Sequence, residues 1–402
     1  MNWSRGVGRF VRSECGAVLV HAAAGLIAAT GASAIAIDLG MQLVDRAAAQ
    51  TAADAGALAG AISLGFDSYS DRTASGPAAL AAQSVAATNR ISSSTSGART
   101  TTVTFPVCPD GFSACIRVDI SRTGIPTLFG QFFGTTTSTV NTRAIAEAKG
   151  ANAIDCMKPF AVPDKWIEHY PNDDTWSPNE TYEYYVTRGR YRGTPRPHPD
   201  EYVPPTAFNP GTGFTLMSDL GTTVILKMGD PLHTVQPGWF FPVRIPRVST
   251  GGNDYRNNIA TCNGIPVGIG DHVQVQPGNV AGPTIQGIQD LIALDPAAYW
   301  NSTTKKVAGS CASANPPCAR YSPRIIAIPV FSPQEWENSE WQDHVPIGHA
   351  TVHIVNILGF FVEGLDANDN VLGHLVMMPG LLREGSSLVE AASFVRASVL
   401  VR

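Results

Sequence analysis

The amino-acid sequence predicts an α+β protein: an N-terminal transmembrane helix that continues into an Ala-rich stalk, a small α+β module, and a larger β-rich extracytoplasmic domain. An apolar run near the N-terminus is long enough to cross a bilayer, and the hydrophobic periodicity after it changes from helical to alternating. The 38 Gly and 29 Pro residues indicate many turns. We expect four segments: a cytoplasmic tail (1–14), the transmembrane helix and stalk (15–66), the small module (67–150) and the β-rich domain (151–402).

Length and charge limit the kinds of partner. The chain has 402 residues, which is enough to bury two hydrophobic cores. Its formal net charge is -5 and only 15% of its residues are charged. Because no basic stretch would attract phosphate groups, we expect no nucleic-acid partner.

The predicted transmembrane helix is the run Ala17–Ile37. It has 21 residues, of which His21 is the one titratable residue, and at 1.5 Å per residue it spans roughly 30 Å, the thickness of a bilayer core. Cleavage at an Ala-rich site is the alternative, but the run is too long for an ordinary signal peptide, which favours retention. Arg5, Arg9 and Arg12 precede it, so we expect the tail in the cytoplasm and the rest of the chain exported.

Cysteine usage fits an exported chain. Cys15 lies at the cytoplasmic edge of the predicted span, and six further cysteines follow it, an even number that indicates disulfides. Their spacing favours pairing the first with the second and the fifth with the sixth, which leaves the third and fourth to close a long loop; this is one of fifteen connectivities. A zinc site is the competing interpretation, but the sequence has no C-x-x-C pair or Cys/His cluster with zinc spacing. The six are Cys108, Cys115, Cys156, Cys262, Cys311 and Cys318.

The stalk and the small module follow from changes in periodicity. Ala34–Leu64 is Ala-rich, has no Pro and carries polar residues among apolar ones, as expected of a helix that leaves lipid. After a Ser/Gly/Pro break, residues 68–91 predict a second Ala-rich helix. The remaining elements expected in the module are strands at Thr101–Val107 and Cys115–Ser121, a helix around Pro126–Phe133, and a Thr/Val-rich strand at 137–148.

The predicted β-rich domain combines short apolar strands with long Pro/Gly loops. One short helix is expected at 285–294, and Pro171–Pro210 is expected to be an extended loop. The strand candidates are Thr223–Gly229, Trp239–Pro246, His272–Gln276, Pro323–Phe331 and Ala350–Leu365.

Three N-terminal motifs occur together: GAVLV at Gly16–Val20, AIDLG at Ala36–Gly40 and QTAADAGALAGA at Gln50–Ala61. In combination they closely resemble the N-terminal signature of the TadE/TadG-like family of Tad (Flp) pilus assembly proteins. Two distal segments, Val267–Gly287 and Ser322–Pro333, resemble the longer TadG-type members more loosely. The motif positions are Gly16, Asp38, Gly40, Gln50, Ala53 and Asp54.

The resemblance implies a non-enzymatic accessory protein of the bacterial inner membrane, with Tad/Flp pilus assembly components as its partners. Tad prepilins have Glu at the fifth position after a cleavage-site Gly; counted from Gly16, that position is His21 here. The missing acid favours a permanent anchor over a subunit of the pilus shaft. The alternative function is a membrane-tethered adhesin or cell-wall-binding module, whose distal domain would contact peptidoglycan or an external surface.

The sequence contains no familiar catalytic pattern. G-x-S-x-G, H-E-x-x-H, P-loop and dinucleotide fingerprints do not occur. Asp119, Ser121 and Thr123 approach the D-x-S-x-S pattern of a von Willebrand factor A metal site, but no βαβ repeat surrounds them. We therefore expect no enzyme, no catalytic residues, no cofactor and no metal.

Overall fold

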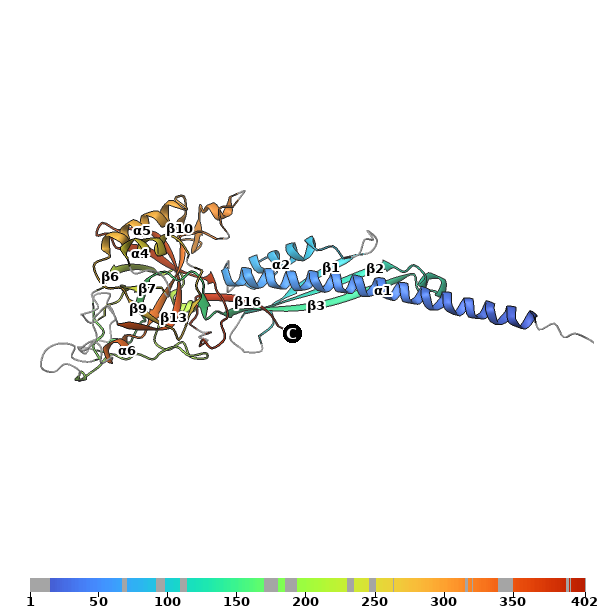
Figure 1. Ribbon diagram of the computed structural model, residues 1–402, viewed down its shortest axis with the longest axis horizontal. Coiled ribbons are helices and arrows are strands. Elements are labelled where there is room, and N and C mark those ends of the chain that lie inside the picture. Colours follow the sequence, from blue (N-terminus) through green and yellow to red (C-terminus); the bar gives the residue numbers. More distant parts are fainter. Residues whose placement is uncertain are drawn as a thin grey trace, which may run out of the picture. The chain divides into compact units, whose positions relative to one another are not determined.

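Figure 1 shows the chain as a computed structural model, in which two compact units are described separately. The first unit comprises Met1–Ala57, Ala82–Val103 and Arg117–Ala144; the second comprises Leu58–Ala81, Thr104–Ile116 and Ile145–Arg402. The residues that the structure describes are 15–66, 71–91, 98–108, 114–169, 180–184, 194–229, 235–245, 251–262, 264–314, 317–319, 321–338, 350–387, 390 and 392–401.

The chain begins with one uninterrupted helix of 52 residues, α1 (Cys15–Phe66). This segment has no Pro and is rich in Ala, the residue with the highest helix propensity. The expected continuation of the apolar run into an Ala-rich helix is therefore confirmed. A second Ala-rich helix, α2 (Pro77–Thr88), is also confirmed, and it begins with Pro, which is well tolerated in a first helical turn.

Three strands follow the helices and lie side by side in chain order: β1 (Arg99–Thr104), β2 (Ala114–Pro126) and β3 (Thr137–Gly150). The alternating strands expected here are confirmed. The helix expected over Pro126–Phe133 is wrong in extent, because β2 continues through Pro126 and only a single 3-10 turn, η1 (Gly130–Phe133), is helical. β-branched residues before the turn favour strand, and Gly134, at φ 86°, ends it in the left-handed region.

The second unit is built on a seven-stranded sheet with the order β12-β5-β7-β6-β14-β13-β9. Because β12 also pairs with β13, six of these strands close into a ring, and closure removes the unpaired edges of an open sheet. The strands are β5 (Phe160–Pro163), β6 (Thr223–Met228), β7 (Trp239–Arg244), β9 (His272–Val275), β12 (Ile325–Phe331), β13 (Thr351–Leu365) and β14 (Val371–Val376).

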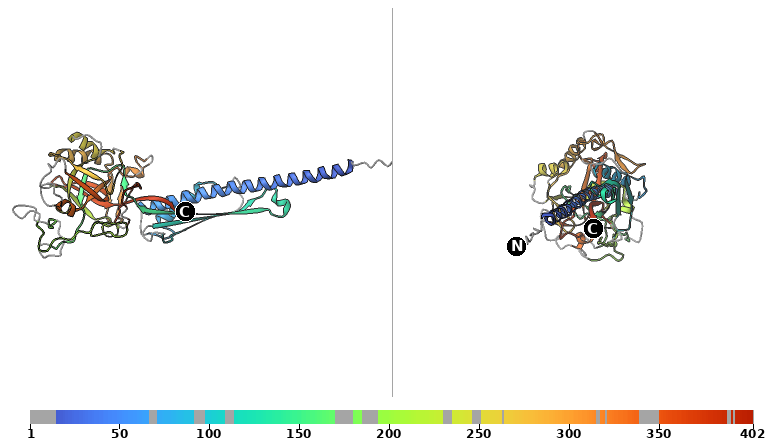
Figure 2. Two further views of the ribbon diagram at one scale, coloured as in Figure 1. Left: turned by 60° about the horizontal axis from the view of Figure 1, so that its bottom comes forward. Right: turned by 90° about the vertical axis from the view of Figure 1, so that its right-hand side faces the viewer.

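Two helices of this unit, α4 (Gly252–Ala260) and α5 (Ala281–Ala293), pack against each other, and α5 also contacts β13 (Figure 2). The helix expected at 285–294 lies almost entirely within α5, whereas α4 was not expected. The shorter elements are β4 (Ala153–Ile154), α3 (Leu216–Asp219), β8 (Val267–Gly268), β10 (Tyr299–Asn301), β11 (Lys306–Ala308), η3 (Cys311–Ser313), α6 (Pro333–Asn338), β15 (Met378–Pro379) and β16 (Val395–Val401).

Among the described residues, two large buried hydrophobic clusters make up most of the core of the second unit, beside a smaller third one. Adjacent residues of β7 divide between them: Phe241 packs with Phe331 and Trp336 in one cluster, while Phe240 packs with Phe160 in the other. Successive side chains of a strand point to opposite faces, so both faces of this sheet are covered. All five strand candidates in this domain are confirmed. Much of the loop expected at Pro171–Pro210 lies outside the described residues.

Candidate functional site

In the first unit, the carboxylate of Asp38 on α1 lies against the turn between β2 and β3. It accepts hydrogen bonds from three consecutive backbone N–H groups: Leu128 at 2.8 Å, Phe129 at 3.0 Å and Gly130 at 2.6 Å. Asp38 itself is only 9% exposed. Backbone N–H groups in a turn form a concave site for an anion, and hydrogen bonds to an ionised acceptor are stronger than neutral ones. Asp38 therefore attaches the hairpin turn to the helix.

A second attachment lies twelve residues further along α1. The side-chain amide of Gln50 donates to the Asp54 carboxylate at 2.8 Å and to the carbonyl oxygen of Arg143, on β3, at 3.0 Å. Ala53, which lies between Gln50 and Asp54 in the sequence, is fully buried. Residues one helical turn apart share a helix face, so this face of α1 is the one applied to the strands. Of the motif residues, Asp38 and Gln50 thus contact the hairpin, Asp54 binds Gln50, and Ala53 is buried.

Gly40, another residue of the predicted motif, has open surroundings. Around Gly40 no heavy atom lies within 4 Å of the position that a Cβ would occupy, and Gly16 lies within α1. The three arginines Arg5, Arg9 and Arg12 lie outside the described residues.

A close helix contact completes the first unit. A Cβ added to Gly56 of α1 would lie 2.9 Å from the carbonyl oxygen of Ala82 and 3.0 Å from the Cβ of Ala86, both on α2. Such distances leave no room for a side chain, so Gly at this position allows the two helices to approach.

Among the described residues, one helix is long and apolar enough to cross a membrane. It covers residues 18–65, and its most apolar 18-residue window has a mean hydropathy of 1.8. From Val18 to Ser33 the helix is exposed almost throughout. Figures 1 and 2 show the N-terminal end of α1 extending beyond the turn between β2 and β3. The expectation of one N-terminal helix with these properties is confirmed by its length and composition.

Residues 22–146 of the chain match the model of the Tad_C family, which is described as Tad-like Flp pilus-assembly. This segment, called the Tad-related region below, covers less than a third of the 402 residues. The match begins in the exposed part of α1 and ends in β3, so it includes the Asp38 and Gln50 attachments. Comparison with curated proteins and with solved structures found no match.

Within the Tad-related region, Asp119 lies between two arginines. Its carboxylate accepts from Arg117 Nε and from Arg143 Nε, each at 2.7 Å. Asp119 is the first residue of the D-x-S-x-S-like pattern, and its carboxylate is engaged in these two ion pairs. In the parts of the chain that the structure describes, no group of three or more His, Cys, Asp or Glu side chains is arranged to hold a metal ion.

The structure joins the six cysteines after the predicted span in the pairing that their spacing favours. The Cα atoms are 5.3 Å apart in the first pair, 4.8 Å in the second and 5.5 Å in the third, all within the usual range for disulfides. The pairs are Cys108 with Cys115, Cys156 with Cys262, and Cys311 with Cys318.

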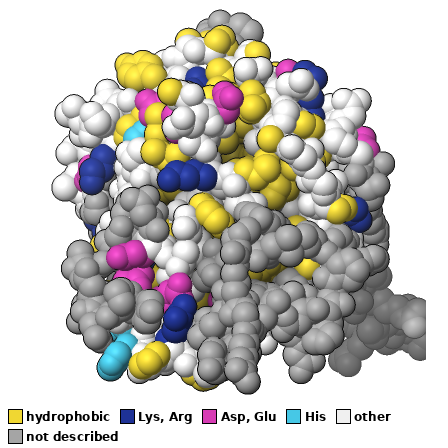
Figure 3. Space-filling view, turned by 90° about the vertical axis from the view of Figure 1, so that its left-hand side faces the viewer, with side chains coloured by type: hydrophobic (Ala, Val, Ile, Leu, Met, Phe, Trp, Pro, Cys, Tyr) yellow, Lys and Arg dark blue, Asp and Glu magenta, His cyan; other side chains and the backbone are white. Residues whose placement is uncertain are grey.

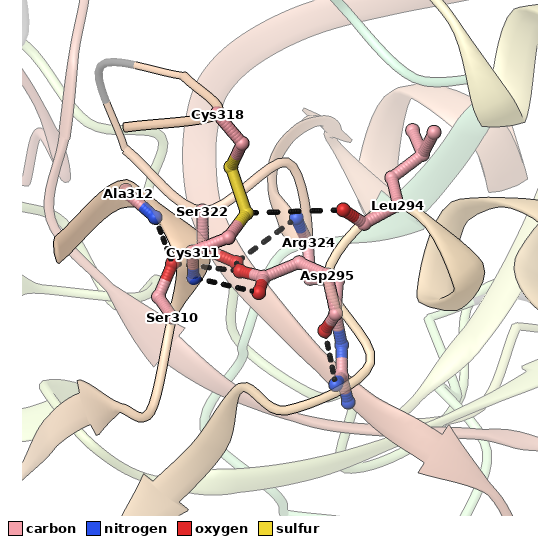
Figure 4. Close-up of a disulfide and its surroundings, with 8 residues drawn as sticks. All are labelled: Leu294, Asp295, Ser310, Cys311, Ala312, Cys318, Ser322 and Arg324. Atoms are coloured by element: carbon pink, nitrogen blue, oxygen red, sulfur yellow. Dashed lines mark hydrogen bonds between the residues drawn. A yellow bond between two sulfur atoms is a disulfide. The ribbon is translucent and has the colours of Figure 1, made fainter. Parts of the chain in front are cut away.

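The third disulfide is held by a buried acid (Figure 4). Asp295 accepts from the backbone N–H of Cys311 at 2.9 Å and from the hydroxyls of Ser310 at 2.7 Å and Ser322 at 2.6 Å. Burial alone would raise the pKa of Asp295, but these hydrogen bonds keep it below its usual range. Arg324 also donates to the backbone carbonyl oxygen of Asp295 at 3.1 Å, which further stabilises this loop.

Sequence reasoning missed a group of buried acids in the second unit. Asp164 accepts from the backbone N–H of Phe214 at 2.8 Å and from the Tyr202 hydroxyl at 3.1 Å, and burial raises its pKa to about 6. Glu168 accepts from the indole N–H of Trp166 at 3.0 Å, and burial together with the neighbouring Asp200 raises its pKa to about 8. No spacing pattern marks these acids, because they lie in or beside a Pro-rich segment without regular periodicity.

Acidic residues with shifted pKa values often mark functional sites, but buried structural networks also shift pKa values. Both oxygens of Asp164 accept hydrogen bonds from groups of the fold. Lys158 is a similar case: it donates to the carbonyl oxygens of Asn258 at 3.3 Å and Thr261 at 2.6 Å, and burial lowers its pKa to about 7. These contacts explain the three groups as parts of the folded structure.

The surface of the second unit is chemically mixed. On the face in Figure 3, hydrophobic side chains, cations and anions are interspersed among the described residues. A cleft of about 920 Å³ lies elsewhere in this unit, and its lining includes Asp71, Trp300, Lys305, Lys306 and Tyr321. A surface that mixes apolar groups with both signs of charge is ordinary for a folded protein and marks no particular partner.

Proposed function

We propose that this chain is a non-enzymatic accessory protein of Tad/Flp pilus assembly, of the TadG type, anchored in the bacterial inner membrane by α1. It acts through extracytoplasmic contacts with other pilus assembly components. The observation that carries the proposal is the family match over residues 22–146, which coincides with the helix that can span a membrane and with the hairpin attached to it.

The proposed orientation places the N-terminus in the cytoplasm. Two features support it: the arginines before the span, and the three disulfides after it. Disulfides persist in oxidising compartments, and positively charged flanks stay in the cytoplasm. Both features favour export of nearly the whole chain.

An assembly role is favoured over catalysis because the family match covers a helix and a hairpin that together form a scaffold. In this scaffold the polar motif side chains bind other groups of the same unit, as Asp38 and Gln50 do. This scaffold would then contribute to pilus assembly by holding partner proteins at a fixed place on the membrane.

In-cell photocrosslinking tests this function. A photoreactive amino acid is placed at exposed Thr51 on α1, or at exposed Met217 in the second unit, and crosslinked partners are identified by mass spectrometry. We expect pilus assembly components at one or both sites, and their loss in cells that lack the other pilus genes. Crosslinks only to glycan or to unrelated surface proteins would instead support the adhesin.

A further inference from the structure

The point at which α1 first becomes covered defines a level along the helix. The first buried side chains are Ala34, 8% exposed, and Asp38, 9% exposed. From Cys15 to Ser33 the helix has 19 residues, and at 1.5 Å per residue this length is roughly 28 Å. A bilayer core is about 30 Å thick. A helix that spans with its uncovered part therefore leaves the hydrocarbon core where the hairpin begins to cover it.

The hairpin turn is held at that same level. Asp38 is the first acidic residue after the uncovered stretch, and the three N–H groups that it accepts from are those of Leu128, Phe129 and Gly130. All of these residues belong to the first unit. We define the tip as residues 127–135, which includes η1. The tip is thus fixed to α1 near the expected edge of the bilayer.

The tip exposes large apolar side chains. Phe132 is 78% exposed, Phe133 is 70% exposed and Leu128 is 51% exposed. No charged residue occurs between Arg122 and Arg143, so twenty consecutive residues around the tip are uncharged. Three exposed apolar side chains in an uncharged turn are unfavourable in water and favourable at a membrane boundary.

We propose that the tip of the β2–β3 hairpin inserts into the outer-facing leaflet of the bilayer, with Phe132, Phe133 and Leu128 in contact with lipid. The proposal rests on the membrane anchoring by α1 proposed above. Lipid is the occupant because the tip is hydrogen-bonded to α1 at Asp38, just after the segment that spans the bilayer in the proposal above. The tip is therefore fixed at the depth where that segment ends. Asp38 is then a positioning residue, whose charge at the membrane edge is satisfied by the three N–H groups.

This second contact restricts the anchor. A single helix can tilt and rotate in a bilayer, whereas a helix with a laterally attached, lipid-embedded tip is less free to tilt. The tilt of α1 toward or away from the tip is then restricted, so the angle between the helix axis and the membrane is defined. A restricted tilt is useful to a protein that presents surfaces to neighbouring membrane components.

Depth-dependent fluorescence quenching tests the tip. An environment-sensitive fluorescent amino acid is placed in the full chain at position 132, at position 26 within the span, or at exposed position 51 beyond the tip. Each protein is reconstituted in phosphatidylcholine liposomes with nitroxide groups at shallow or deep acyl positions. We expect strong deep quenching at 26, shallow quenching at 132 at least twofold above that at 51, and little quenching at 51.

The outcomes separate this inference from the anchor itself. Quenching at 26 without quenching at 132 would overturn the tip contact and leave the anchor intact, and a protein partner for the tip would then be the occupant to seek by crosslinking. Absence of quenching at 26 would overturn both. Asp38→Ala in the position-132 protein should reduce its shallow quenching about twofold, while the same substitution should leave the position-26 signal unchanged.

Discussion

At the scale of single residues, Asp38 shows how one side chain links distant parts of the sequence. It lies about ninety residues before the three N–H groups that it accepts from, and it joins a helix to a strand turn. Asp54, in the third of the N-terminal motifs, accepts from Gln50 one helical turn away. A long-range anchor and a local helix pair should differ strongly in their effect on stability.

Asp38→Ala should therefore loosen the hairpin turn. The loss of hydrogen bonds to three N–H groups should cost about 2 kcal/mol, because hydrogen bonds to charged groups are stronger than average. Hydrogen exchange by mass spectrometry should show faster exchange at residues 128–130. Asp54→Ala is the matched control, with an expected cost of about 0.3–0.5 kcal/mol for an i,i+4 pair. Equal effects of the two substitutions would contradict the role of Asp38.

Glu168→Gln should change how stability depends on pH. Because the folded-state pKa of Glu168 is raised to about 8, above its usual value of 4.5, the folded state binds more protons between these values, and its stability falls as pH rises through them. The Gln variant lacks this loss, so its advantage over the parent protein should grow between pH 5 and pH 8.5. A shift of this size corresponds to about 4 kcal/mol without screening, and with solvent screening we expect about 2 kcal/mol.

Denaturant unfolding at the two pH values measures the Glu168 effect. Asp290→Asn is the control, because the Arg256 contact lowers the pKa of Asp290 and its titration is complete below pH 5. The effect of that substitution should be the same at both pH values. If Glu168→Gln also behaves alike at both, the buried acid is not the source of the pH dependence.

At the scale of elements, two glycines of α1 have opposite surroundings. Gly56 faces α2 at a distance that leaves no room for a methyl group, whereas the space around Gly40 is open. A helix gains stability from Ala in place of Gly only where the added methyl group fits.

Gly40→Ala should stabilise the helix by about 0.5–1 kcal/mol. Gly56→Ala should destabilise the protein by about 1 kcal/mol, because α2 must move away and this strain exceeds the gain in helix propensity. Thermal unfolding followed by circular dichroism compares the two variants. Stabilisation by both substitutions would show that α2 does not pack closely at Gly56.

The disulfides differ in the length of chain that they close. Cys156 and Cys262 are separated by 106 residues, and Cys311 and Cys318 by 7. In the chain-entropy description, the longer loop should contribute about 2 kcal/mol more. We expect replacement of the long-loop pair by Ala to lower the unfolding midpoint in urea more than replacement of the short-loop pair. The reverse order would mean that the short loop stabilises mainly through the Asp295 contacts.

At the scale of the whole molecule, the charges before the span should set its orientation. Alkaline phosphatase fused after residue 402 should be active, because this enzyme folds only outside the cytoplasm. Replacement of Arg5, Arg9 and Arg12 by Glu should reduce that activity several-fold, since the positive-inside preference is lost. Accessibility of the fusion to external protease is the second measurement. An inactive fusion on the unchanged chain would contradict the proposed topology.

Much of the architecture could be predicted because it is written in local patterns. The long helix, α2 and the alternating strands each follow from the periodicity and composition of a continuous segment, and so does the capacity of α1 to span a membrane. The division of the chain into four segments stays a prediction, and the compact units of the structure combine parts that are separated in sequence. The strand β16 is an example, because it pairs with β3 from more than two hundred residues away.

The sequence by itself determined the type of most elements, the family resemblance of the N-terminal region and the favoured cysteine pairing, because each depends on neighbouring residues or on simple spacing. Only the tertiary structure decided the closure of six strands into a ring, the burial of Glu168 and the attachment of Asp38 to the hairpin turn. These features depend on contacts between residues far apart in the chain. Such contacts leave no periodic signal, since many pairings of the same strands would satisfy the same local pattern.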